Sequence, residues 1–168
     1  SLSNLLKKSG NDVSQEYYVN DQGLQTKILA DSVHKKYLEK FKKDTSKIDD
    51  TNFYKGEYID ELATTIKNRE NDTYIELKDK KKFIDLIIKE MMKNIKMTLK
   101  EFKVNFDSFY SESSLYKKFG SNQNKIQEVL KDLEGEYSFK NQGAIWFKST
   151  QFGDDKDRVL IRSDDQET

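Results

Sequence analysis

Glu112 and Ser111 stand where a charged ligand could be bound. They directly follow the aromatic-rich run from Phe106 to Tyr110, which is typical of a strand, and ligand sites of α/β proteins gather at the C-terminal ends of strands. A carboxylate there could accept charge-assisted hydrogen bonds from a cation such as a guanidinium. Alternatively, Glu112 could lie in the first turn of a following helix with Ser111 as its N-cap. The residues alone leave these two interpretations equal.

A second polar segment contains Asn20, Asp21 and Gln25, and it follows the strand-like run from Tyr17 to Val19. Asn and Asp end strands well because their side chains bond to nearby backbone, and Gly23 adds backbone freedom. A structural turn is therefore the commoner interpretation. The functional alternative is that these polar side chains shape the floor of a binding site.

Four lysines could contact phosphate groups of RNA: Lys35, Lys36, Lys42 and Lys43. They lie toward the distal end of an expected helix, and each phosphate contact would be independent of base sequence. A solvated, lysine-rich helix face is the commoner explanation of such a run. We therefore predict RNA contact here only as a secondary possibility.

The sequence predicts no metal centre. Cysteine is absent, and His34 is the single histidine and lies within an expected amphipathic helix, where a structural or solvated role is favoured. Asp154, Asp155 and Asp157 could hold magnesium through oxygen ligands, but acidic residues in a turn before a strand more often cap backbone amides.

Apolar periodicity predicts an α/β fold interrupted by helices. The clearest helix is expected over 79–103, where apolar residues recur every three or four positions. The other expected elements are helices within 1–10 and over 24–41, 54–67 and 126–133, strands over 16–20, 105–110 and 159–161, a hairpin of 137–140 with 144–147, and a tight polar turn within 153–157. We predict three segments: a first part at 1–43, a helical insertion at 44–104 and a continuation at 105–168.

Composition narrows the class of protein. The 168 residues include 30 basic and 30 acidic side chains, so no net field draws the whole chain to nucleic acid or to an anionic membrane. No apolar run approaches the roughly 20 residues that cross a bilayer. We expect a cytoplasmic protein without membrane contact. Because the chain begins at Ser1 and stops just after a strand-like run, we also expect it to be a piece of a longer protein.

Three stretches together resemble the arginyl-tRNA synthetases, which are class I aminoacyl-tRNA synthetases. These stretches are Tyr17-Tyr-Val-Asn-Asp-Gln-Gly-Leu-Gln25, Phe106-Asp-Ser-Phe-Tyr-Ser-Glu-Ser-Ser-Leu-Tyr116 and Gly153-Asp-Asp-Lys-Asp-Arg-Val-Leu-Ile-Arg-Ser163. The resemblance implies a Rossmann-like nucleotide-binding fold with a helical insertion. It also implies that the parent enzyme, expected to be a monomer, uses ATP with Mg²⁺, L-arginine and tRNA(Arg), and that Glu112 binds the arginine side chain.

The family's two ATP signatures are expected outside this chain. A His-x-x-His motif should precede Ser1, and a loop like Lys-Met-Ser-Lys-Ser should lie beyond Thr168, so the chain alone is expected to be inactive and no catalytic residue is assigned. One departure is Ser163-Asp164-Asp165 in place of the family's Ser-Asp-Gly. Two alternatives stay open: a helical module that binds a partner helix through the face of 79–103, and a paralogue that binds tRNA or arginine without joining them.

Overall fold

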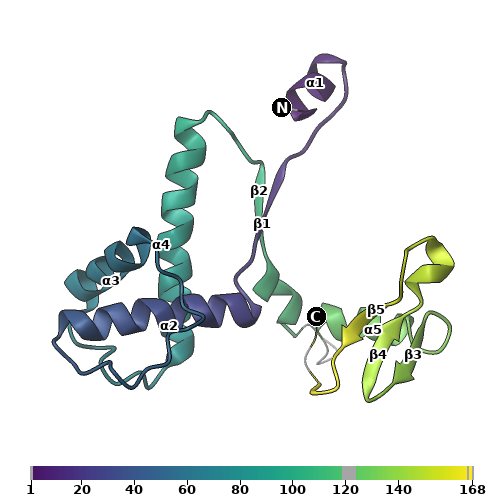
Figure 1. Cartoon of the computed structure of the whole chain (residues 1–168). Helices are drawn as coiled ribbons and strands as arrows, with labels where there is room; N and C mark the ends of the chain where they lie inside the picture. Colours follow the sequence, from purple (N-terminus) through teal and green to yellow (C-terminus); the bar gives the residue numbers. More distant parts are fainter. Residues whose placement is uncertain (1, 119–123, 166, 168) are drawn as a thin grey trace. The chain divides into compact units, whose positions relative to one another are not determined.

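The computed structural model describes residues 2–118, 124–165 and 167 (Figure 1). The chain divides into two compact units, Ser1–Ser113 and Ser114–Thr168. Within the described residues, no helix is both long and apolar enough to cross a membrane.

The first unit is built mainly from helices. Figure 1 labels α1 (Leu2–Lys8), α2 (Gly23–Lys40), α3 (Glu57–Glu70) and α4 (Lys80–Glu101). The prediction of a helix in each of these regions is confirmed. The third helix begins later than predicted because Gly56 serves as its N-cap, with φ −76° and ψ 156°, rather than forming part of its first turn.

One hydrophobic core joins α2, α3 and α4, because each helix turns its apolar stripe toward the other two. The buried members are Ala30, Val33 and Tyr37 from α2, Ile59, Leu62, Ala63 and Ile66 from α3, and Phe83 and Ile87 from α4. Polar contacts support this core: the Tyr37 hydroxyl donates to the Asn71 carbonyl, and Arg69 Nη1 donates to Glu90 Oε1 at 2.5 Å. Burial raises the pKa of Tyr37, which keeps this hydroxyl protonated as a donor.

A pair of parallel strands completes the first unit: β1 (Glu16–Val19) pairs with β2 (Ser108–Ser111), with Val19 opposite Ser111. The second strand begins three residues later than predicted. Asp107, just before this strand, instead forms two hydrogen bonds with Gln15. Its Oδ2 accepts from the Gln15 amide at 2.8 Å, and its amide donates to the Gln15 carbonyl at 2.8 Å. Both strands end at the same edge, as parallel pairing requires.

The 3₁₀ helix η1 (Glu112–Tyr116) follows β2, and the second unit then contains α5 (Lys125–Asp132). Asn124 and Gln127 form a reciprocal capping box at the start of α5, which satisfies two backbone amides. Next come β3 (Ser138–Asn141), β4 (Ala144–Phe147), η2 (Ser149–Phe152) and β5 (Arg158–Ile161). These strands form an antiparallel sheet in the order β3-β4-β5.

The hairpin prediction is confirmed. Gln142 and Gly143, both with positive φ (49° and 80°), join β3 to β4, as expected for a two-residue turn that matches strand twist. The polar turn predicted within 153–157 begins at Gly153, whose φ is 92°, and the short helix η2 precedes it in the β4–β5 connection. The shared core contains residues of α2, which lies in the predicted segment 1–43, and residues of α3 and α4, which lie in the predicted insertion at 44–104. Core packing therefore does not separate these two predicted segments. The three-segment division stays a prediction.

Candidate functional site

The polar residues after β1 and after β2 meet at the common end of the two strands. Asp21 lies at the centre of this cluster: its Oδ2 accepts from the hydroxyls of Ser111 at 2.5 Å and Ser113 at 3.0 Å, and its Oδ1 accepts from the Ser113 amide at 2.7 Å. The two serine hydroxyls are 2.7 Å apart. The Asp21 carboxylate therefore joins segments about 90 residues apart and holds the start of η1 against the end of β1.

Glu112 is the first residue of η1, directly beside this cluster. The surrounding partners orient the Asn20 amide so that its nitrogen donates to Glu112 Oε2 at 3.2 Å and to the Gln22 carbonyl at 3.1 Å. Glu112 thus lies just after β2 and in the first turn of a helix. Binding of a cation by Glu112 stays a prediction. Ser111 does not act as the expected N-cap, because its hydroxyl bonds to Asp21 instead.

Sequence reasoning missed Ser113, although it belongs to the same Ser-Glu-Ser segment as Glu112. Its amide and hydroxyl supply two of the three donors to Asp21. The spacing of two residues between Ser111 and Ser113 was the available signal. The pairing with Asp21 depends on strand register, which that spacing does not contain.

Gln25 lines a small hollow of about 240 Å³ together with Asn20. Its apolar wall includes Leu29, Ile88 and Met91. Tyr54 and Tyr58 also line this hollow, and neither was singled out from the sequence. The two tyrosines lie two residues before and two residues after Gly56, and this symmetric spacing was the sequence signal that could have indicated them.

The four predicted phosphate-binding lysines have different surroundings. Lys35 Nζ pairs with Asp50 at 2.5 Å, which lowers the pKa of Asp50, and Lys36 Nζ pairs with Glu39 at 2.7 Å. Lys42 and Lys43 are exposed just beyond α2. Lys35 and Lys36 line one further hollow of about 360 Å³, which Lys42 and Lys43 do not. RNA contact by these lysines stays a prediction.

The aspartates considered for magnesium hold the β4–β5 connection together. Arg158 forms two hydrogen bonds of 2.7 Å with the Asp154 carboxylate and one of 2.8 Å with Asp155, and this guanidinium lowers the pKa of Asp154. Asp157 Oδ1 accepts from the Thr150 amide at 3.1 Å, which is the backbone-capping role favoured above. Among the described residues, no group of three or more acidic, histidine or cysteine side chains could hold a metal.

His34 takes part in the helical core. Its Nε2 lies 2.8 Å from the Tyr74 carbonyl, so this nitrogen carries the proton in that contact. The imidazole also stacks on Tyr37 and meets the Phe83 ring edge-on. Of the structural or solvated role predicted for this histidine, these contacts support the structural one.

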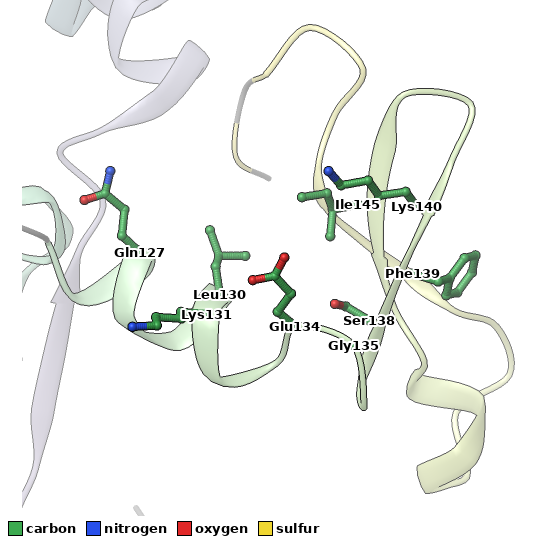
Figure 2. A pocket seen from close by; sticks show the side chains of 9 residues that line it. All are labelled: Gln127, Leu130, Lys131, Glu134, Gly135, Ser138, Phe139, Lys140 and Ile145. Carbon is green, nitrogen blue, oxygen red and sulfur yellow. The ribbon is translucent and has the colours of Figure 1, made fainter.

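The second unit has a hollow of about 500 Å³ between α5 and the β3–β4 hairpin (Figure 2). Figure 2 shows Leu130 and Glu134 on the α5 side and Lys140 and Ile145 on the hairpin side. Phe139 points to the other side of the hairpin, where its ring stacks on Trp146 at 6.4 Å. No residue predicted to bind a ligand lines this hollow.

Comparison with known proteins shows that the chain is similar to one group of enzymes. No protein-family model matches the chain. A curated relative from Geobacillus kaustophilus, named arginine–tRNA ligase, is 40% identical, and the match covers 98% of this chain and 29% of the relative. A relative of the same name from Legionella pneumophila is 36% identical, and the match covers 100% of this chain and 33% of the relative.

A solved structure assigned to an arginyl-tRNA synthetase from Campylobacter jejuni is also similar. It superimposes with a TM-score of 0.83 at 31% identity, and the match covers 99% of this chain and 36% of that one. The chain spans 29% to 36% of the length of these proteins. The resemblance seen in the sequence is therefore confirmed: almost the whole chain corresponds to a segment of arginine–tRNA ligases and fits as a fragment of one.

Proposed function

We propose that this chain is part of an enzyme that activates L-arginine with ATP and transfers it to tRNA(Arg), and that it contributes part of the arginine site. The observation that carries the proposal is the position of Glu112. Its carboxylate lies at the C-terminal end of a parallel strand pair and is held by Asn20 at 3.2 Å. Sites of α/β proteins lie at this edge.

Glu112 would bind the arginine side chain directly. A guanidinium presents several N–H donors in one plane, and a carboxylate is its best-matched acceptor. Only one oxygen, Oε2, accepts from Asn20. Oε1 and the remaining lone pair of Oε2 are then suited to accept from a guanidinium, while the Asn20 amide orients the carboxylate.

Asp21 would act as a positioning residue. It accepts three hydrogen bonds from Ser111 and Ser113, the two neighbours of Glu112 in sequence. Holding both neighbours restricts the backbone that carries the carboxylate. Restricting a binding group before the ligand arrives lowers the entropy cost of binding.

The finer properties of the parent enzyme belong to the same proposal and rest on the family resemblance. They are a class I, Rossmann-like nucleotide-binding fold, ATP with Mg²⁺ as substrate and ion, a monomeric state and a cytoplasmic location. Both reaction steps would depend mainly on positioning and charge stabilisation. The residues described above are assigned to arginine, and none of them is assigned to ATP or Mg²⁺.

The alternative of a helical interaction module is less well supported. It needs a free apolar face over 79–103, but Ile84 and Met91 of that face pack partly buried against the core that α4 forms with α2 and α3. Large exposed apolar side chains lie toward its far end, where Met97 is 50% and Phe102 75% exposed.

The proposed function is tested by ATP–pyrophosphate exchange with the full-length protein that contains this chain. Each of the twenty amino acids is supplied with and without total tRNA. We expect exchange with arginine alone, and only when tRNA is present. Exchange with another amino acid, or none with any, would refute the proposed activity.

A further inference from the structure

The hollow of about 500 Å³ between α5 and the β3–β4 hairpin, here called the α5 hollow, has the size of a small-molecule site. All of its described lining residues belong to the unit Ser114–Thr168. The lining is mainly apolar with a few polar side chains among it, which is the usual composition of a ligand pocket. Its residue types therefore indicate which kind of molecule it suits.

Two opposite charges lie on facing walls of the α5 hollow. Figure 2 shows Glu134, just after α5, and Lys140 of β3, with both side chains directed into the space between the walls. Both residues are exposed, and among the described residues neither side chain forms an ion pair or a hydrogen bond. A ligand that carries a positive and a negative group can therefore pair with both at once.

An aliphatic patch lies beside these charges. It is formed by Leu130 of α5 and Ile145 of β4, which are both half-buried. Phe139 is the single aromatic residue in the described lining, and its ring stacks on Trp146 on the other side of the hairpin. This lining therefore presents no ring face on which a flat base would stack. Leu130 and Ile145 suit an aliphatic chain instead.

The charges that reach the middle of the α5 hollow are balanced. Figure 2 shows Lys131 directed away from the hairpin wall, and Ser138 adds only a neutral hydroxyl. With one carboxylate and one ammonium facing the space, a phosphate would meet repulsion from Glu134 and a simple cation would meet repulsion from Lys140. A zwitterion, which carries both charges, can place each one beside its opposite.

We propose that the α5 hollow binds a free α-amino acid with an aliphatic side chain. Its ammonium group donates to the Glu134 carboxylate, its carboxylate accepts from the Lys140 ammonium, and its side chain packs between Leu130 and Ile145. An α-amino acid carries these three groups on one carbon atom, so one small molecule satisfies all three parts of the hollow. The site shares no residue with the proposed arginine site, and binding there goes beyond the proposed function.

The test is a ligand-detected NMR titration of the full-length protein with L-leucine. Saturating L-arginine is present, so that the proposed arginine site is occupied. Affinity should rise from glycine through alanine to leucine, by up to about 4-fold for each buried methylene. Leucyl-leucine is titrated in parallel, because its charged ends lie on different residues.

Two substitutions, each combined with one altered ligand, test the two charges separately. Lys140→Gln should weaken leucine binding by up to about 5-fold, the upper limit for an exposed ion pair, but should not weaken leucinamide, which has no carboxylate. Glu134→Gln should likewise weaken leucine but not N-acetyl-leucine, which has no ammonium group. Both positions are exposed, so the fold should persist in both variants.

Matched controls come from the same unit. Lys156→Gln and Glu128→Gln remove exposed charges that do not line the α5 hollow, and they should leave leucine affinity unchanged. A loss of affinity in these controls equal to that in Lys140→Gln and Glu134→Gln would overturn the proposal, because the effect would then come from the general field of the unit.

Three other results would also overturn the proposal. They are no binding of leucine, equal binding of glycine and leucine, and binding of leucyl-leucine without binding of free leucine, which would assign the hollow to a peptide. Failure of the proposed function is a separate result. It would appear as absent ATP–pyrophosphate exchange with arginine by the wild-type protein, whatever its affinity for leucine.

Discussion

Replacing Glu112 with glutamine removes the charge of the proposed arginine site with almost no change of shape. The glutamine oxygen can still accept from Asn20, which now donates to Glu112 at 3.2 Å, so the local structure should persist. A hydrogen bond to a charged group contributes about 1.5–3 kcal/mol and a neutral one about 0.5–1.5 kcal/mol. The loss should therefore be about 1–2 kcal/mol, or roughly 5- to 30-fold in kcat/KM for arginine.

The assay is tRNA-dependent ATP–pyrophosphate exchange by the full-length protein, with arginine varied at saturating ATP and tRNA. L-citrulline, whose neutral urea group replaces the guanidinium, is added as a competitor. Glu112→Gln should lower kcat/KM for arginine but change the inhibition constant of citrulline far less. The substitution removes the attraction between the carboxylate and the guanidinium charge, and citrulline has no such charge. Glu61→Gln, an exposed carboxylate on α3, is the control.

Two results would contradict this reasoning. Unchanged kcat/KM for arginine would remove Glu112 from the site. Equal weakening of arginine and citrulline would mean that the glutamine disturbs the shape of the site, so that the Glu112 charge has no specific role.

Three further predictions concern stability, measured by urea unfolding of the chain. Ile66→Ala, at a fully buried site, should cost about 2–5 kcal/mol, whereas Thr65→Ala next to it should stay within about 0.5 kcal/mol; equal costs would contradict the described core. Asp21→Asn should cost about 1–3 kcal/mol, since three hydrogen bonds to its carboxylate lose their charge assistance; no loss would disprove its role in joining the strand ends. Arg158 lowers the folded-state pKa of Asp154, so the pair stabilises above the unfolded pKa of about 3.9 and loses this effect as pH falls through the folded-state pKa. Arg158→Gln should therefore reduce the loss of stability below about pH 4, and an unchanged acid profile would contradict it.

Much of the secondary structure could be predicted because its signals are local. The helices α2 and α4 follow from apolar residues three and four positions apart, and the β3–β4 hairpin follows from apolar runs around Gln142 and Gly143. Errors arose where a distant contact decides a boundary. The start of β2 is one example, because Asp107 is held before the strand by Gln15, which lies 92 residues earlier.

For the candidate site, too, local patterns could be predicted and long-range contacts could not. Its individual residues were predictable, since a carboxylate after a strand-like run and an Asn-Asp pair after another are patterns within a few positions. Their arrangement was not, because Asn20 reaches Glu112 only through the parallel register of β1 and β2. The same holds for the hollow of about 240 Å³ beside Asn20, whose lining comes from three separate parts of the chain, within 20–29, 54–58 and 88–91.

The sequence by itself determined which segments become helices and strands, and it indicated the family through three matched stretches. Apolar period and turn residues act within a few positions, so these properties can be recognised without a fold. The tertiary structure alone decided that Asp21 joins Ser111 to Ser113, that Asn20 orients Glu112 and that Tyr58 lies against Gly56. Even the last contact, between residues two apart, depends on where α3 begins, and the others require strands about 90 residues apart to pair in one register.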